Sequence, residues 1–150
     1  RGAIMPMRCE IVSQDRSVFS GEADMVVLPG TEGVMGILPR HSPVLSTLNY
    51  GLIRVRYKDT EQIFTVAGGV VEVLPDRVTI LADAAENVQE IDIQRAETAR
   101  QRAEELLRQA ADDPKMSEKF LEVEAALRRS TLRLNAARRF GRVSGRDKND

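Results

Sequence analysis

Two different spacings of hydrophobic positions divide the chain near Glu90. Before that point, short runs rich in Val, Ile and Leu alternate with turn residues at roughly 8–12-residue intervals, as in successive strands. The runs cover residues 8–13, 23–28, 34–38, 52–57, 62–66, 70–74 and 78–81. Many short strands with no intervening helical pattern predict an antiparallel β-sandwich over residues 1–88, within an α+β fold.

Residues 52–57 show the two faces of such a strand. Ile53 and Val55 alternate with Arg54 and Arg56, which is typical of a strand with one face on a core and the other in water. Turn residues separate the runs, and we expect the chain to reverse at Pro29-Gly30, Pro39, Asn49-Tyr50-Gly51, Lys58-Asp59-Thr60 and Pro75-Asp76.

After Glu90 the apolar positions recur every three or four residues, which predicts amphipathic helices. Within residues 92–111 the recurring positions are Ala96, Ala99, Ala103, Leu106 and Ala110. From residue 116 onward they are Met116, Phe120, Val123, Leu127, Ser130, Leu134 and Ala137. Asp113-Pro114 separates the two helices as N-cap and first helical residue, so residues 89–140 should form an antiparallel two-helix hairpin.

The first helix offers mostly alanine to this seam. An alanine removes little area from water, because burial contributes only about 0.8 kcal/mol per CH₂ group. We therefore expect the hairpin to be weakly held together and its docking to change easily.

Composition excludes several classes of function. With 22 basic and 23 acidic residues, 4% aromatic residues and no Trp, the chain is poorly suited to coat nucleic acid or to stack bases. Cys9 and His41 are each the single residue of their type, which excludes a disulfide framework and a metal site built on several Cys or His ligands.

No run approaches the roughly 18 apolar residues of a membrane span, so we expect a soluble, cytoplasmic protein without direct membrane insertion. Residues 1–6 are expected to be an addition to the domain or disordered.

Charge is uneven along the chain. Residues 1–88 carry 8 basic and 11 acidic side chains, whereas residues 89–150 carry 14 and 12. Most of the excess is a basic run comprising Arg128, Arg129, Arg133, Arg138, Arg139, Arg142, Arg146 and Lys148, with Asp147 as its one acid. This run is either a solvated helix end favoured by the helix dipole or a contact for an acidic protein surface or phosphate.

Four segments of this sequence resemble the epsilon subunit family of bacterial F-type ATP synthase. They are G-V-M-G-I-L-P-R-H-S-P at 33–43, V-A-G-G-V-V-E-V at 66–73, V-T-I-L-A-D-A-A-E at 78–86 and I-D-I-Q-R-A at 91–96. Each is weak alone, but together they occur in the family's order and spacing from residue 8 to about residue 137.

The resemblance implies a sandwich of about ten strands followed by the helical hairpin. It also implies a non-catalytic rotor subunit of the central stalk of a proton-translocating ATP synthase, peripheral on the cytoplasmic face of the bacterial plasma membrane. The sandwich would bind the gamma subunit and rest on the membrane ring of c subunits. The hairpin would fold against the sandwich or extend toward the alpha and beta subunits and inhibit ATP hydrolysis. The partner-binding residues would be His41, Arg128, Arg138 and Arg139.

In several members of the family, the motif that corresponds to I-D-I-Q-R-A at 91–96 helps to bind one ATP without hydrolysing it. Carried over, the resemblance implies an ATP site at Glu86, Ile91, Asp92, Arg95, Ala96, Arg129 and Arg133, with ATP as a regulatory ligand and no cofactor required. Arg95 and Arg129 each lie about 17 residues from a turn at 112–113, which would place them at one level of the hairpin, with Arg133 one turn beyond. Guanidinium groups suit phosphate oxygens. The alternative is that Asp92 is the first-turn acid of its helix and Arg95 its exposed neighbour.

The sequence departs from the family pattern in the 33–43 segment. Val34 stands where the family often has a carboxylate, with Glu32 two residues earlier, which puts any inherited ring contact in doubt. Arg40 replaces a glycine before His41, so we expect the loop to lack a positive-φ residue there. His41 is expected to be a loop or ring-contact residue. Cys9 is expected to be a small buried hydrophobe, and residues 141–150 a flexible basic tail.

Two other classes of function stay open at this point. A free-standing nucleic-acid-binding module would use the basic hairpin, but the acidic sandwich and the few aromatic residues disfavour it. An independent enzyme is disfavoured because the sequence offers no nucleophile–base pair, no phosphate-binding glycine loop and no dinucleotide fingerprint. No catalytic or metal-binding residues are assigned.

Overall fold

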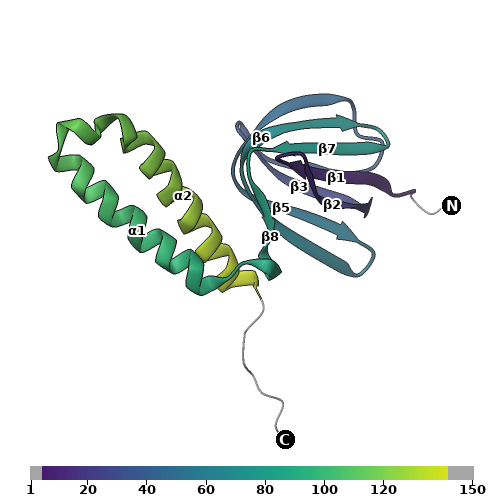
Figure 1. The fold of residues 1–150 in the computed structure, drawn as a ribbon. Coiled ribbons are helices and arrows are strands. Elements are labelled where there is room, and N and C mark those ends of the chain that lie inside the picture. The colour runs from purple at the N-terminus through teal and green to yellow at the C-terminus, as the bar shows by residue number, and fades with distance from the viewer. Residues whose placement is uncertain (1–4, 142–150) are drawn as a thin grey trace, which may run out of the picture. The chain divides into compact units, whose positions relative to one another are not determined.

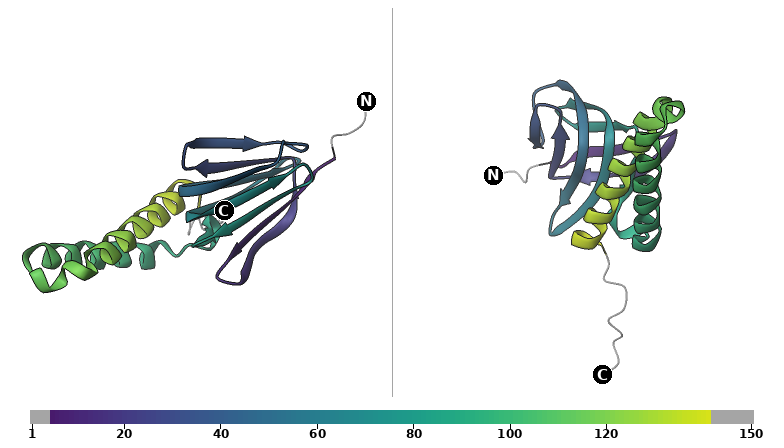
Figure 2. Two further views of the ribbon diagram at one scale, coloured as in Figure 1. Left: turned by 90° about the horizontal axis from the view of Figure 1, so that it is seen from above. Right: turned by 90° about the vertical axis from the view of Figure 1, so that its left-hand side faces the viewer.

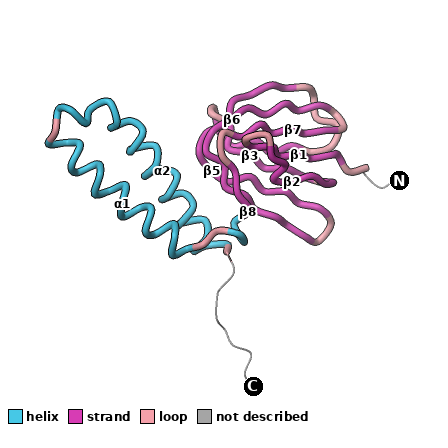
Figure 3. Tube along the Cα trace, viewed as in Figure 1, coloured by secondary structure: helices cyan, strands magenta, loops and turns pink. Residues whose placement is uncertain are grey.

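A computed structural model of the chain describes residues 5–141 and divides it into two compact units between Asn87 and Val88 (Figure 1). Strands make up the first unit and helices the second (Figure 3). The fold class predicted from the sequence, a β-sandwich followed by a helical hairpin, is confirmed. The two units are described separately below.

Eight strands form the described part of the first unit. They are β1 (Met7–Ser13), β2 (Arg16–Ala23), β3 (Met25–Gly30), β4 (Gly33–Ile37), β5 (Val44–Tyr57), β6 (Thr60–Leu74), β7 (Arg77–Ala82) and β8 (Ala85–Asn87). Their order is β2-β1-β7-β6-β5-β3-β4, with β8 paired to β6. The pairs are antiparallel except β1 with β7, which is parallel.

The count is eight strands rather than about ten because β5 and β6 are long and continue through expected breaks. Asn49-Tyr50-Gly51, which we expected to be a turn, lies inside the 14-residue β5. The runs 62–66 and 70–74 are both parts of the 15-residue β6. Curved strands of this length serve both layers of a sandwich, as the view from above shows for the first unit (Figure 2).

A pair of glycines forms the bend in β6. Gly68 and Gly69 have φ values of 86° and 144°, and the otherwise unbroken β5–β6 register lacks one pair at this point, between Leu48↔Gly69 and Tyr50↔Ala67. A Cβ on Gly69 would overlap the Leu81 carbonyl oxygen and lie 2.9 Å from the Ala82 Cα. Only glycine therefore allows β7 to approach so closely, and β6 can pair with β8 before the bend and with β7 from Gly69 onward.

The core of the first unit is one continuous apolar cluster contributed by residues of β1 to β7, mostly at alternate positions. Phe64 is the largest fully buried side chain, and the Phe19 ring packs against it at 5.4 Å between centroids. Cys9 is fully buried, as its strand position predicts, and burial raises the pKa of its thiol to about 12. The thiol therefore acts as a small hydrophobe.

The loop after β4 corrects one expectation. Arg40 has a φ of 68°, so this position keeps a left-handed backbone although it is not glycine. The Arg40 backbone N–H donates to the Pro75 carbonyl oxygen at 2.7 Å, which holds the conformation in place. A left-handed non-glycine residue costs about 1–2 kcal/mol. His41 beside it is half-buried, and its Nδ1 lies 2.7 Å from the Ser42 carbonyl oxygen.

The second unit consists of α1 (Ile93–Asp112) and α2 (Ser117–Phe140), preceded by the 3₁₀ turns η1 (Val88–Glu90) and η2 (Pro114–Met116) respectively. The helices run side by side in opposite directions in all the views of Figures 1 and 2. The predicted seam is confirmed at its buried positions, which are Ala96, Ala103, Ala110, Ser130, Leu134 and Ala137.

The seam is tighter at one end of α2 than at the other. Met116, Phe120, Val123 and Leu127 are only half-buried, whereas the buried positions of α2 all fall within residues 130–137 of the described chain. The hairpin is therefore closed most firmly where the beginning of α1 meets the end of α2. No helix among the described residues is both long and apolar enough to cross a membrane.

Candidate functional site

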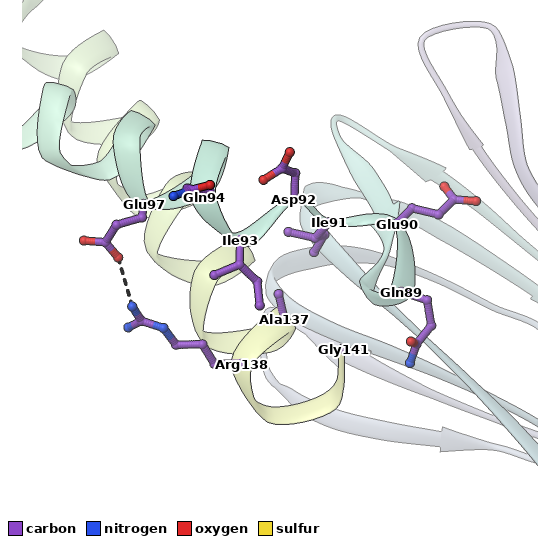
Figure 4. A pocket seen from close by; sticks show the side chains of 10 residues that line it. All are labelled: Gln89, Glu90, Ile91, Asp92, Ile93, Gln94, Glu97, Ala137, Arg138 and Gly141. Carbon is purple, nitrogen blue, oxygen red and sulfur yellow. Dashed lines mark hydrogen bonds and ion pairs between the residues drawn. The ribbon is translucent and has the colours of Figure 1, made fainter. Parts of the chain in front are cut away.

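A pocket of about 660 Å³ lies at this closed end of the hairpin (Figure 4). Its walls come from η1, the start of α1 and the last turns of α2. The lining residues are Gln89, Glu90, Ile91, Asp92, Ile93, Gln94, Glu97, Ala137, Arg138 and Gly141.

Asp92 has a structural role at the edge of this pocket. It is the N-cap of α1, and its Oδ1 accepts a hydrogen bond from the Arg95 backbone N–H at 3.0 Å. A cap of this kind satisfies one of the free N–H groups of the first turn. This is the structural alternative raised for Asp92, and the Arg95 side chain is exposed as that alternative predicts.

The pocket contains only part of the set assigned to ATP. Ile91 and Asp92 line it, whereas Arg95, Arg129 and Arg133 are not among its lining residues. Ala96 is fully buried in the helix seam. Glu86 belongs to β8 of the first unit, where its carbonyl oxygen accepts a hydrogen bond from Thr65 at 3.4 Å.

The register of the hairpin explains this partial overlap. The chain does not turn at 112–113 alone but through residues 113–116, which include η2. As a result Arg138, and not Arg129, reaches the second turn of α1, where its Nη2 lies 3.1 Å from Glu97 Oε2. Arg129 is nine residues earlier in the same helix, about 13 Å along the axis. The expectation that Arg95 and Arg129 share one level is therefore wrong for this hairpin.

Glu97 is the centre of a charge network that sequence reasoning missed. One carboxylate oxygen pairs with Arg100 Nη2 and accepts from Gln101 Nε2 at 3.3 Å, and the other pairs with Arg138 (Figure 4). Arg100 also pairs with Glu104 through Nη1 at 2.8 Å. The signal in the sequence was the spacing of Glu97, Arg100 and Glu104 by three and four residues, which places charges side by side on a helix.

The network changes the acidity of its members. The hydrogen bond from Arg100, followed by the charges of Arg100 and Arg138, lowers the pKa of Glu97 against the opposing effect of desolvation. The hydrogen bond to Glu97 likewise raises the pKa of Arg100. Both shifts favour the charged forms of Glu97 and Arg100 at neutral pH.

The electrostatics of the pocket do not match a triphosphate. Three carboxylates line it, from Glu90, Asp92 and Glu97, against the single guanidinium of Arg138, which is already paired. The described part of the chain has no group of three or more His, Cys, Asp or Glu residues placed to hold a metal ion.

The residues assigned to partners lie on exposed parts of the chain. The side chains of Arg128, Arg138 and Arg139 are exposed and His41 is half-buried, and the Arg139 guanidinium lies 4.9 Å from the centre of the Phe140 ring. The remainder of the basic run, from Arg142 onward, falls outside the described residues.

The outer face of the sandwich carries an apolar patch formed by Leu45, Val70 and Leu81. Val70 pairs with Leu81 across β6 and β7 and with Thr47 on β5, two residues from Leu45. The three side chains are 72%, 38% and 57% exposed, although they sit on adjacent strands. Contiguous exposed apolar groups on a soluble domain are typical of a protein-binding surface. The pattern of the strands did not reveal it, because a fully buried strand also has apolar residues on both faces.

The comparison with known families identifies this β-sandwich and helical hairpin as a subunit of ATP synthase. Residues 6–88 match the family model "ATP synthase, Delta/Epsilon chain, beta-sandwich domain" and residues 89–138 match "ATP synthase, Delta/Epsilon chain, long alpha-helix domain". This chain belongs to the ATP synthase delta/epsilon chain family, and the resemblance found in the sequence is confirmed.

Within that family the chain is similar to proteins named ATP synthase epsilon chain. It is 46% identical to that of Herpetosiphon aurantiacus over 134 residues, which cover 89% of this chain and 96% of the relative. It is 43% identical to that of Halalkalibacterium halodurans over 133 residues, covering 89% and 98%. The relatives are subunits of ATP synthase, so the chain is a non-catalytic component and not an enzyme in its own right.

A solved structure shares the fold. A chain of the Euglena gracilis mitochondrial ATP synthase superposes with a TM-score of 0.71 at 23% identity, covering 91% of this chain and 84% of that chain. At this identity the likeness concerns the fold.

Proposed function

We propose that this chain is a rotor subunit of a bacterial proton-translocating ATP synthase, located peripherally on the cytoplasmic face of the plasma membrane. Its sandwich would join the gamma subunit to the membrane ring of c subunits, and its hairpin would restrain ATP hydrolysis by extending toward the alpha and beta subunits. Family membership supports the assignment.

The apolar patch is the observation that carries the proposed contact with gamma. Burying Leu45, Val70 and Leu81 against a partner contributes favourable free energy in proportion to the apolar area removed from water. A second exposed apolar group, Val34 at 78% and Leu38 at 57%, lies beside His41 in the segment proposed to face the c-ring. The two contacts would therefore use different surfaces of the sandwich.

Copurification from a reconstituted complex tests both contacts. Leu81→Glu places a charge in the patch and should reduce recovery with gamma at least tenfold, whereas Leu38→Glu should leave gamma binding intact and weaken attachment to the c-ring. Each variant is the matched control of the other, since both put a carboxylate on an exposed apolar position. Full recovery of Leu81→Glu with gamma would contradict the proposal.

The proposed inhibition rests on the hairpin. The buried positions of its seam are alanine and serine apart from Leu134, so the seam buries little area and we expect closed and extended forms to differ by only a few kcal/mol. The exposed guanidinium groups of Arg128, Arg129 and Arg139 suit an acidic segment of a beta subunit. Deleting residues 89–150 should raise ATP hydrolysis by the assembled enzyme, and unchanged hydrolysis would contradict this role.

We also propose ATP as a regulatory ligand, supported by the I-D-x-x-R-A motif, two of whose residues, Ile91 and Asp92, line the pocket. Because carboxylates outnumber guanidinium groups in this pocket, ATP would bind in an arrangement of the hairpin that adds Arg95, Arg129 and Arg133 to it. Calorimetric titration of the chain with ATP, with and without magnesium, should show one saturable site. Binding should be lost in Arg95→Ala or Arg129→Ala but kept in Arg102→Ala, an exposed arginine of α1 outside the motif. The same affinity in all three variants would refute the site assignment.

A further inference from the structure

We propose that Glu97 is an electrostatic latch that holds the last turns of α2 against α1 and thereby sets how readily the hairpin opens. The proposal deepens the proposed inhibitory function, because opening of the hairpin is the step that such inhibition requires.

The first argument is that the two carboxylate oxygens of Glu97 have different partners. Oε1 is bound by Arg100 and Gln101 of its own helix, which fixes the rotamer of the side chain. Oε2 is left to reach across to Arg138, 41 residues later in the sequence. A side chain already held in place loses less conformational entropy when it forms the second contact.

The second argument is burial. The Glu97 side chain is 24% exposed and its partner Arg138 is 58% exposed, whereas both partners of the Glu105–Arg108 pair are exposed, at 58% and 70%. The Nε of Arg100 is fully enclosed and has no hydrogen-bond partner among the described residues. A partly enclosed charge is screened less by water and salt than an exposed one, so the enclosure of Glu97 makes the cross-helix pair worth somewhat more than a pair in which both partners are exposed.

The third argument is position. The pair lies at the closed end of the hairpin, where Gln89 Nε2 also donates to the Phe140 carbonyl oxygen at 2.8 Å and where the buried residues of α2 are concentrated. The half-buried contacts near the turn offer little resistance to separation. Opening therefore requires the Glu97–Arg138 pair to break.

The latch also affects partner binding. Arg138 belongs to the basic run proposed to meet an acidic partner, yet in the closed hairpin its guanidinium is engaged by Glu97. An acidic partner segment would have to replace Glu97, so the latch opposes extension of the hairpin.

Amide hydrogen exchange of the isolated full-length chain tests the latch in the absence of any partner. Glu97→Gln keeps the size and helix propensity of the side chain and should raise the exchange rates of residues 130–140 about twofold to fivefold. Glu105→Gln is the matched control, because it breaks an ion pair within α1 that does not cross to α2, and it should leave those rates unchanged. Residues 7–82 should exchange at the same rates in both variants.

Two further measurements distinguish a latch from a local effect on α1. Arg138→Gln should raise the same rates, and the double variant should exceed the larger single effect by little, since both remove one contact. In about 1 M NaCl the difference between wild type and Glu97→Gln should shrink, because the screening length falls to ~3 Å. Equal effects of Glu97→Gln and Glu105→Gln, or fully additive effects of Glu97→Gln and Arg138→Gln, would overturn the latch. Loss of gamma binding would contradict the proposed function but leave this result standing.

Discussion

Replacing Gly69 by alanine tests whether the close approach of β7 to β6 organises the sandwich. Gly69 has a φ of 144°, and a Cβ there would overlap the Leu81 carbonyl oxygen and lie 2.9 Å from the Ala82 Cα. Both are backbone atoms of a paired central strand, so they cannot move without disturbing the pairs Gly69↔Ala82 and Val70↔Leu81.

The expected loss of unfolding free energy in Gly69→Ala has two parts, and a control variant separates them. A non-glycine residue in this region of φ costs about 2 kcal/mol, and overlap with packed atoms adds about 2 kcal/mol. Gly33 has a φ of 138° with nothing within 4 Å of an added Cβ. Gly33→Ala should therefore lose about 2 kcal/mol of unfolding free energy and Gly69→Ala about 4 kcal/mol. The additional loss corresponds to a melting temperature roughly 10 °C lower.

Tyrosine fluorescence during urea or thermal unfolding measures this loss in the sandwich alone. The chain has no Trp, and both of its tyrosines, Tyr50 and Tyr57, lie in β5. Helical circular dichroism follows the hairpin separately. Equal destabilisation by Gly33→Ala and Gly69→Ala would refute the argument, because it would show that the conformation of the glycine matters and the contact with β7 does not.

Two further predictions follow from the loop after β4 and from the charge network. Arg40→Gly should raise the unfolding free energy of the sandwich by up to about 1 kcal/mol in the same tyrosine assay. The reason is that the left-handed backbone at φ 68° then carries no side-chain penalty. A loss of stability would contradict the strain assigned to Arg40. The lowered pKa of Glu97 means that its contribution to hairpin stability is complete above the ordinary value of 4.5 and is lost as the pH falls through the lower folded value. Thermal melts followed by helical circular dichroism should therefore show a steeper loss below pH 4.5 in wild type and Glu105→Gln than in Glu97→Gln, and parallel pH profiles in all three would contradict the assignment.

The sequence alone determined the division of the chain and the nature of its parts. Alternation over two residues and recurrence over three or four are local properties, so the strand-rich first part, the two helices and the seam positions from Ala96 to Ala137 could be read from them. The motifs at 33–43 and 91–96 identified the family for the same reason, because they consist of adjacent residues.

Only the tertiary structure decided how distant segments meet. A turn signal such as Asn49-Tyr50-Gly51 does not distinguish a reversal from a bend inside a long strand, because the outcome depends on whether β6 pairs along the whole length of β5. A seam of small side chains can pack in several registers at similar free energy, so the sequence could not establish that Arg138, and not Arg129, meets the start of α1. Neighbours that are remote in sequence also decide three other features, and local patterns carry no information about such neighbours. These features are the left-handed backbone of Arg40, the exposed patch on β5 to β7 and the role of Glu97.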